Sequence, residues 1–230
     1  IDERVGTDPG TWLAVTSISF DISVLEIFWT LCRGFETVIQ EEGDKASMLK
    51  SQPQTVVSDR PMGFGLFYFA ADSSNAATTN AYRLMLEGAK FADDNDFVSV
   101  WTPERHFHAF GGLYPNPAVT SAAMASITSK VELRAGSVVI PLHDPIRVAE
   151  EWAVVDNISQ GRVGLSFASG WHVNDFALKS ENFERRREVM QESISTVLRL
   201  WAGEKIKVKN GAGDEIEVSV LPKPVRPCPP

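Results

Sequence analysis

The sequence predicts an α/β fold built on a parallel sheet. Four apolar runs typical of buried strands begin near residues 64, 97, 132 and 162. A stretch with the apolar spacing of a helix follows each run, so the strands recur about every 30 to 35 residues. This rhythm is typical of consecutive β-α units, in which a helix connects each strand to a parallel neighbour.

Two architectures share this rhythm. A doubly wound sheet can be complete with four or five strands, whereas a (β/α)8 barrel needs about 250 residues. Residues 62–230 supply four units, so in the barrel alternative they form only an N-terminal half. Such a half leaves two edge strands unpaired, and we expect it to be unstable or to self-associate when it is made alone.

Each predicted element has local support. Asn116 and Asp144 suit helix N-caps, and a proline follows each of them in the first helical turn. Gly161 suits the end of the helix that Asp144 begins. The charged stretch 206–220 predicts a hairpin. The predicted strands lie at 63–70, 97–101, 131–140 and 162–170, and the predicted helices at 78–95, 116–129, 144–159 and 182–203.

The first 61 residues have a different texture. Residues 11–20 are strand-like, and residues 21–32 have helical spacing, with Asp21 as a candidate cap and Gly34 as a candidate end. Residues 41–61 are polar and free of aromatic side chains, which predicts a linker.

Composition excludes several classes of function. The formal net charge of −8 makes binding to nucleic acid phosphates a poor hypothesis. No apolar run approaches the roughly 20 residues that span a bilayer. Cys32 and Cys228 form neither a disulfide framework nor a zinc spacing, which favours the cytoplasm. The start lacks the features of a signal peptide, and the chain looks cut at both ends.

All four histidines follow predicted strands. His106 and His108 come after the second strand together with Glu104, His143 comes after the third, and His172 after the fourth. Loops at the carboxyl ends of parallel strands share one face, which is the active face of barrel enzymes. Ordinary loop or cap positions are the alternative for each histidine. Histidines beside Glu104 could also hold zinc or iron, as in a metal-dependent hydrolase.

Small residues interrupt two strands. Gly136 and Ser137 lie inside the third strand, where glycine often marks a bulge or the close approach of a ligand. Ser169 and Gly170 end the fourth strand and suit a phosphate, with a plain tight turn as the alternative. The chain contains no GxGxxG or P-loop sequence, so classical dinucleotide or nucleoside triphosphate binding has no support.

Several segments together resemble the luciferase-like flavin monooxygenases, closest to the subgroup embedded in nonribosomal peptide and polyketide synthetases. They are "GFGLFYFA", "VWTPERHFHAFGGLYPNP" and "RAGSVVIPLHDPIRVAEEWAVVDNISQGRVGLSFASGWHVNDF", and the match covers nearly all of residues 62–203. The resemblance implies a (β/α)8 barrel of the bacterial luciferase type, with its N-terminal half at 62–230. It also implies reduced FMN, or a deazaflavin in some branches, and O2 as the oxidant.

The resemblance assigns cofactor-binding residues. Gly136 and Ser137 would lie against the flavin ring, at a position where the family often has a strained or cis peptide. Ser169 and Gly170 would approach the flavin phosphate, with Trp171 beside them. The remaining phosphate ligands would come from the second half of the barrel.

The resemblance also assigns catalytic residues, namely Glu104, Arg105 and His106. His106 matches the second histidine of the family's "EHHF" segment and could donate or accept a proton near neutral pH. Arg105 stands where the family has the first histidine, the one tied to catalysis. This difference from the family pattern argues against the luciferase reaction itself. The Arg105 guanidinium could stabilise developing negative charge.

Residues 13–39 resemble the adenylation domains of nonribosomal peptide synthetases, which makes 1–40 a fragment of such a domain. The "FDIS" segment matches the core motif that opens the substrate pocket. Asp21 would pair with the α-ammonium of an amino acid, and Ile22 and Leu25 would line the pocket. A simple helix cap is the alternative role for Asp21.

The order of the two resemblances suggests a monooxygenase inserted into an adenylation domain. The implied partners are a carrier-protein-bound aminoacyl or acyl substrate, a flavin reductase and the rest of the megasynthase, with no nucleic acid or membrane. Family members often pair their barrels, which admits a homodimer. A metal-dependent hydrolase and a non-catalytic interaction module are the alternative functions.

Overall fold

The computed structural model describes residues 11–14, 36–39, 63–69 and 80–226, and the chain divides into two compact units, Ile1–Pro61 and Met62–Pro230. In the first unit, strand β1 (Thr11–Ala14) pairs in parallel with β2 (Glu36–Ile39). β1 confirms a strand within 11–20, whereas β2 was not predicted. The predicted helix at 21–32, with Asp21, Ile22 and Leu25, and the predicted linker at 41–61 lie outside the described residues.

The second unit is built on one parallel sheet. Its strands are β3 (Gly65–Phe67), β4 (Ser99–Thr102), β5 (Glu132–Val139) and β6 (Val163–Ala168), and they pair in the order β3-β4-β5-β6. All three pairings are parallel, which confirms the prediction. Strands that are consecutive in sequence are also neighbours in the sheet, as they are in a barrel wall. In a doubly wound sheet, by contrast, the strand order reverses near the middle of the sheet.

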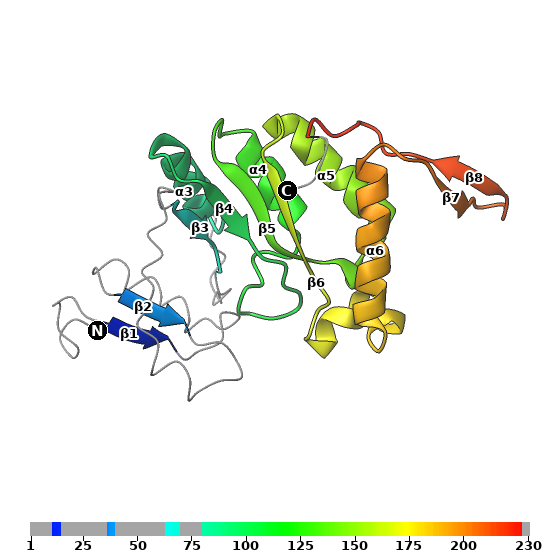
Figure 1. Cartoon of the computed structure of the whole chain (residues 1–230), viewed down its shortest axis with the longest axis horizontal. Helices are drawn as coiled ribbons and strands as arrows, with labels where there is room; N and C mark the ends of the chain where they lie inside the picture. Colours follow the sequence, from blue (N-terminus) through cyan, green and yellow to red (C-terminus); the bar gives the residue numbers. More distant parts are fainter. Residues whose placement is uncertain (1–10, 15–35, 40–62, 70–79, 227–230) are drawn as a thin grey trace. The chain divides into compact units, whose positions relative to one another are not determined.

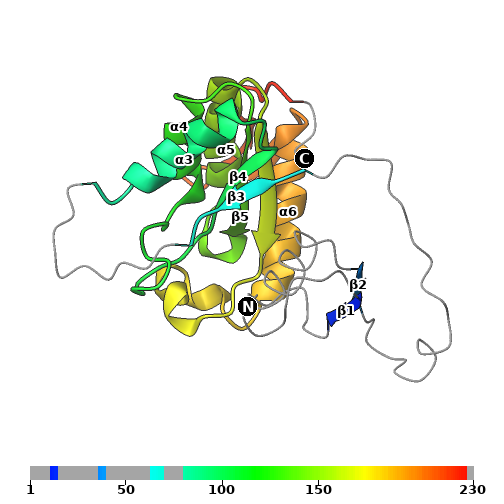
Figure 2. The same cartoon turned by 90° about the vertical axis from the view of Figure 1, so that its left-hand side faces the viewer.

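Helices connect these strands, and Figures 1 and 2 show the four β-α units following one another along the sheet. The α-helices are α3 (Arg83–Asp94), α4 (Pro117–Ala125), α5 (Pro145–Ser159) and α6 (Arg186–Trp201). Short 3-10 helices are η2 (Ile140–Leu142), η3 (Val173–Leu178) and η4 (Ser180–Asn182). The predicted fourth helix begins four residues later than expected, because η4 ends at Asn182 and a bend and turn occupy residues 183–185.

Two of the predicted N-caps, Asn116 and Asp144, are confirmed. The Asn116 side chain accepts hydrogen bonds from the backbone N–H groups of Ala118 and Val119, at the start of α4. The Asp144 carboxylate accepts the same kind of bonds from Ile146 and Arg147, at the start of α5. Each cap satisfies donors that have no partner inside the helix, so both helices begin at a residue that the sequence marks.

Successive side chains of strand β5 lie on opposite faces of the sheet. Leu133 and Ala135 are fully buried in the cores that the strands share with the helices. Side chains alternate along a strand, so Arg134 lies on the opposite face, where its guanidinium is 5.0 Å from the centre of the Trp101 ring. Phe67 is 54% exposed. The second face is therefore partly open, and it is lined by flat aromatic side chains.

The last elements return the chain to the start of β6. Strands β7 (Ile206–Lys209) and β8 (Glu215–Val218) form the predicted antiparallel hairpin. The buried carboxylate of Asp156 on α5 then accepts the N–H groups of Val225 and Arg226 at 2.7 and 2.9 Å. The Arg226 guanidinium reaches the carbonyl oxygen of Val163, so this segment is fixed at the amino end of β6.

Candidate active site

The four histidines gather at the carboxyl ends of the strands, as predicted. His106 and His108 follow β4, His143 follows η2 beyond β5, and His172 follows β6. The structure divides them into two groups. His106 and His143 both contact Glu104. His172 lies near Asp175, and its ring centre is 6.0 Å from that of His108.

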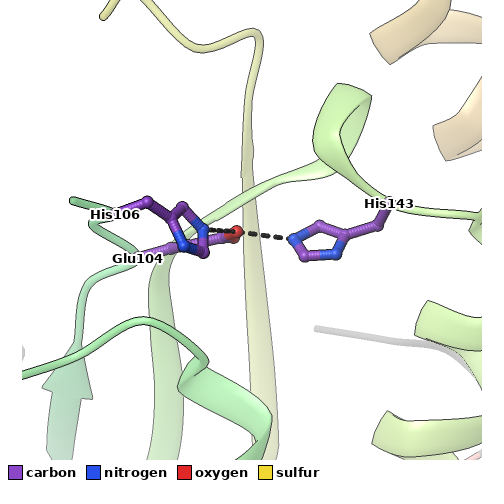
Figure 3. Close-up of side chains that lie close together, drawn as sticks. All are labelled: Glu104, His106 and His143. Carbon is purple, nitrogen blue, oxygen red and sulfur yellow. Dashed lines mark hydrogen bonds and ion pairs between the residues drawn. The ribbon is translucent and has the colours of Figure 1, made fainter. Parts of the chain in front are cut away.

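Glu104 is the centre of the first group, which Figure 3 shows in close-up. Its Oε1 atom lies 2.8 Å from Nε2 of His106 and 2.5 Å from Nε2 of His143. Its Oε2 atom accepts the backbone N–H of Val139 at 2.7 Å. The Glu104 side chain is completely buried, so three donors from two neighbouring strand ends hold a carboxylate that water does not reach.

This arrangement shifts two pKa values. Burial alone would raise the pKa of Glu104, but the hydrogen bonds from His106, His143 and Val139 outweigh it and lower the pKa below its ordinary value. Burial alone would lower the pKa of His143, but the hydrogen bond and charge of Glu104 outweigh it and raise the pKa. Glu104 is therefore ionised at neutral pH, and His143 carries a positive charge more readily than a free histidine.

The same three side chains are a potential metal-ligand set, since their ligand atoms lie within 4.8 Å of one another. The geometry favours hydrogen bonding instead. Both histidine nitrogens approach one carboxylate oxygen at hydrogen-bond distance, and the other oxygen holds a backbone N–H. A metal ion bound by both nitrogens and Oε1 would replace two hydrogen bonds and push the ligands apart, because ligand atoms stand about 2.0 to 2.2 Å from zinc on different sides.

Arg105 belongs to the second group. Its side chain is buried, its Nη1 atom lies 3.9 Å from Oδ2 of Asp175, and its Cζ atom is 4.9 Å from the centre of the Trp171 ring. His172 Nδ1 lies 3.6 Å from the other oxygen of Asp175. These distances are too long for hydrogen bonds, and the Arg105 Nε atom has no partner among the described residues. The Arg105 charge therefore faces a carboxylate that partly compensates it.

Gly136 and Ser137 are joined by a cis peptide bond. The register between β5 and β6 shifts between Gly136 and Val138, which confirms the predicted irregularity in this strand. A side chain at Gly136 has no room, because its Cβ atom would lie 2.8 Å from the Phe67 ring and 3.0 Å from the Trp101 ring. Glycine thus lets two aromatic rings reach the backbone on the open face of the sheet.

The turn after β6 also depends on glycine. Gly170 has a φ of +75°, and a Cβ atom there would lie 2.8 Å from both Val139 and Phe176. Ser169 precedes it, and Trp171 follows with 75% of its surface exposed. The predicted turn is therefore present, and a large exposed aromatic side chain stands beside it.

A groove of about 570 Å³ lies next to this face. Phe107 forms one wall, and its ring centre is 5.7 Å from that of His106. The other lining residues come from η3, η4 and the segments beside them: Val173, Asn174, Phe176, Ala177, Ser180 and Phe183. The groove is mostly apolar and begins beside a predicted catalytic residue.

Comparison with known proteins identifies the family. The family model described as luciferase-like monooxygenase matches residues 62–230. The chain belongs to the luciferase-like monooxygenase family. The predicted resemblance is thus confirmed at the level of the family, whose match extends beyond the predicted residues 62–203.

Individual relatives of this luciferase-like chain carry oxygenase names. The oxygenase component of the flavin-dependent trigonelline monooxygenase of Acinetobacter baylyi is 31% identical over 146 residues, which are 62% of this chain and 40% of the relative. Among solved structures, monooxygenase RslO1 of Streptomyces bottropensis is 32% identical with a TM-score of 0.65, over 73% of this chain and 52% of that one. The chain thus spans about half the length of the relatives that it matches.

A third comparison concerns the fold. The oxygenating constituent of 3,6-diketocamphane monooxygenase of Pseudomonas putida, solved in complex with FMN, has a TM-score of 0.58 and 18% identity, over 68% of this chain and 43% of that one. Flavin as the cofactor of the family's monooxygenases is therefore confirmed. None of the helices in the described part of the luciferase-like chain is long and apolar enough to cross a membrane.

The structure adds two site residues that were not among the predicted catalytic ones. His143 was noted after the third strand, but its contact with Glu104 was not predicted. Asp175 was not singled out, although it is the carboxylate that faces Arg105. In both cases the partner lies far away in the sequence. The only available signal was position, since both residues follow strands of the same sheet.

Proposed function

We propose that the second unit is the N-terminal half of a luciferase-type barrel that uses reduced FMN and O2 to oxidise an organic substrate. The observation that carries this proposal is the buried group of Glu104, His106 and His143, placed at the carboxyl ends of the strands in a member of this family. The match to about half of each relative, the open strand edges and the exposed aromatic face support the barrel half.

The residues present fit a flavin in part. A flat tricyclic ring suits a wall of flat side chains, and Phe67, Trp101 and the bare backbone at Gly136 offer one. Buried polar atoms of Arg105 and Asp175 have no hydrogen-bond partner among the described residues, so a polar group of a ligand could bond to them. Within the described residues the single buried guanidinium faces a carboxylate, so Ser169 and the Gly170 turn would supply only part of a phosphate site.

The bound flavin supplies the redox chemistry with O2, and the protein positions, shields and exchanges protons. His106 donates its Nε2 proton to Glu104, so its Nδ1 atom is left to take a proton from a reacting group. Arg105, held against Trp171, contributes positive charge at the carboxyl ends of the strands. Phe107 and Trp171 would exclude water from the reacting centre, since both are exposed aromatic side chains at its rim.

For the substrate we propose a carrier-protein-bound aminoacyl or acyl group in a nonribosomal peptide or polyketide synthetase of the cytoplasm. The resemblance of residues 1–40 to an adenylation domain supports this, with Asp21, Ile22 and Leu25 as its pocket residues. A flavin reductase and the other domains of the synthetase would be the partners. The apolar groove beside Phe107 has room for an acyl chain.

The direct test replaces one histidine of the loop after β4 at a time in the full-length protein. His106→Ala should lower oxygen incorporation into a carrier-loaded acyl group by about 100-fold, the scale of a lost general acid or base, with little change in FMN affinity. His108→Ala is the matched control, because His108 lies two residues away and has no hydrogen bond to Glu104. Equal loss of oxidation and flavin binding in His106→Ala would contradict the role.

The alternative functions give different results in the same preparation. About one equivalent of zinc or iron, lost on changing His106 or His143 and accompanied by no flavin binding, would favour a metal-dependent hydrolase. Neither metal nor flavin in a well-folded full-length protein would leave a non-catalytic interaction module. A deazaflavin that binds where FMN does not would change the cofactor and keep the family chemistry.

A further inference from the structure

His143 is placed to control His106 without touching it. The two ring nitrogens share one acceptor, the Oε1 atom of Glu104, at 2.5 and 2.8 Å. Figure 3 shows the two rings approaching that oxygen from opposite sides. His106 follows β4, and His143 follows β5. Glu104 and His143 are 39 positions apart in the sequence.

The shared acceptor fixes where the ring protons sit. An ionised carboxylate only accepts hydrogen bonds, so both histidines donate from Nε2. A neutral His106 then has its lone pair on Nδ1, which has no hydrogen-bond partner among the described residues. The hydrogen bond to Glu104 therefore fixes Nδ1 as the proton-accepting atom of neutral His106. A change in how the negative charge of Glu104 is compensated then changes the protonation of His106.

His143 compensates part of the negative charge of Glu104. A buried carboxylate with one neutral histidine would draw a second proton onto that histidine, because a buried negative charge favours a positive neighbour. A charged His143 compensates Glu104 instead. Its other charged neighbour is Glu151 on α5, which also favours the charged form and is itself paired with Arg147 at 3.0 Å.

We propose that His143 is a positioning residue that compensates the charge of Glu104, so that His106 keeps a single ring proton on Nε2 and leaves Nδ1 open. The catalytic consequence rests on the proposed function, but the effect on the ring of His106 does not. His143 itself contacts the carboxylate of Glu104, and the proposed proton-accepting atom is Nδ1 of His106. Removal of His143 should change the chemistry through His106 alone.

The test observes the ring of His106 in the full-length protein labelled with ¹⁵N at histidine, with signals assigned by their loss in single variants. In the wild type, the neutral form of His106 should carry its proton on Nε2, which faces Glu104. In His143→Ala the doubly protonated fraction should rise about threefold or more, because Glu104 is left uncompensated. His108→Gln is the control and should leave the His106 signal unchanged.

A second variant separates charge from packing. His143→Gln keeps a hydrogen-bond donor for Glu104 and loses only the charge, so it remains informative if His143→Ala does not fold. It should show the same rise in doubly protonated His106 and a kcat lower by about twofold or more, in proportion to the loss of neutral His106, with KM within about twofold, since substrate binding is unaffected. An unchanged His106 signal in folded His143→Gln would overturn the proposal.

The two levels of the argument fail separately. If the His106 signal responds as expected but the protein neither binds FMN nor oxidises, the positioning role stands and the proposed function is wrong. If FMN binds and oxidation proceeds while the His106 signal is the same in the wild type and in the His143 variants, the function stands and the positioning role is wrong.

Discussion

Asp93 and Glu104 are two buried carboxylates in the same unit, and they are held in opposite ways. Asp93 on α3 accepts the backbone N–H groups of Ser129, Lys130 and Val131 at 2.6 to 2.8 Å and the Ser129 hydroxyl at 3.0 Å. These donors lie just before β5, at the amino end of the sheet. Glu104 lies at the carboxyl end and, within the part of the chain that the structure describes, has one backbone donor beside its two histidines.

The partners decide what each carboxylate can do. Burial alone would raise the pKa of Asp93, but the four hydrogen bonds lower it to about 2. Backbone N–H groups do not titrate, so Asp93 is a fixed negative charge that ties α3 to the start of β5. The two side-chain partners of Glu104 are imidazoles, which can gain and lose a proton, so the second carboxylate belongs to a group that can exchange protons. Barrel enzymes separate stability and chemistry between the same two ends.

The largest expected effect is on stability. Asp93→Ala removes four hydrogen bonds to a charged acceptor and leaves the buried N–H of Val131 without a partner, so it should lower the free energy of unfolding by about 3 kcal/mol. Chemical denaturation of the full-length protein measures this. Asp94→Ala is the control, since Asp94 is the next residue on the same helix and is exposed. Equal stability of the two variants would remove the structural half of the comparison.

Glu104→Gln should act on chemistry instead. A neutral amide can no longer fix both histidines as donors, so oxygen incorporation into the carrier-loaded substrate should fall about 100-fold. The exposed Glu181→Gln controls for the loss of one negative charge. Full activity in Glu104→Gln would show that this carboxylate serves only the fold, as Asp93 does.

A smaller effect is expected for the open face of the sheet. Gly136→Val places a side chain where Phe67 and Trp101 approach the backbone, and it should weaken FMN binding at least tenfold, or about 1.4 kcal/mol. Gly211→Val is the matched control, because nothing lies within 4 Å of a Cβ atom at that position. Normal FMN affinity in a folded Gly136→Val protein would count against a flavin at this face.

The smallest expected effect is the pH dependence of stability. The lowered pKa of Glu104 contributes stability above its ordinary value of 4.5, which is lost as the pH falls through the folded pKa. The raised pKa of His143 contributes stability below its ordinary value of 6.5, which is lost as the pH rises through the folded pKa. The contribution should therefore peak between about pH 4.5 and 6.5, at about 1 kcal/mol.

Unfolding experiments across this pH range measure the contribution. Glu104→Gln should flatten the decline above pH 6.5, since His143 then has no carboxylate to pair with. Asp93→Ala should leave that decline in place, because the contribution of Asp93 changes only in acid, as the pH falls from 3.8 towards 2. A decline that survives unchanged in Glu104→Gln must come from other groups.

The sequence predicted the sheet well, because strand order follows from apolar runs and helix starts follow from local caps such as Asn116 and Asp144. It placed the four histidines at one end for the same reason. It could not divide them into two groups, since the contacts of His143 with Glu104 and of Arg105 with Asp175 join residues 39 and 70 positions apart. Such contacts depend on side-chain directions that periodicity does not encode.

The most direct test of the central claim is an anaerobic calorimetric titration of the full-length protein with reduced FMN. We expect one saturable site per chain, filled below about 1 mM FMN, the upper range of common enzyme affinities for small ligands. Gly136→Val should weaken it and Gly211→Val should not. A folded protein that takes up no reduced FMN, or that binds it equally in both variants, would contradict the account.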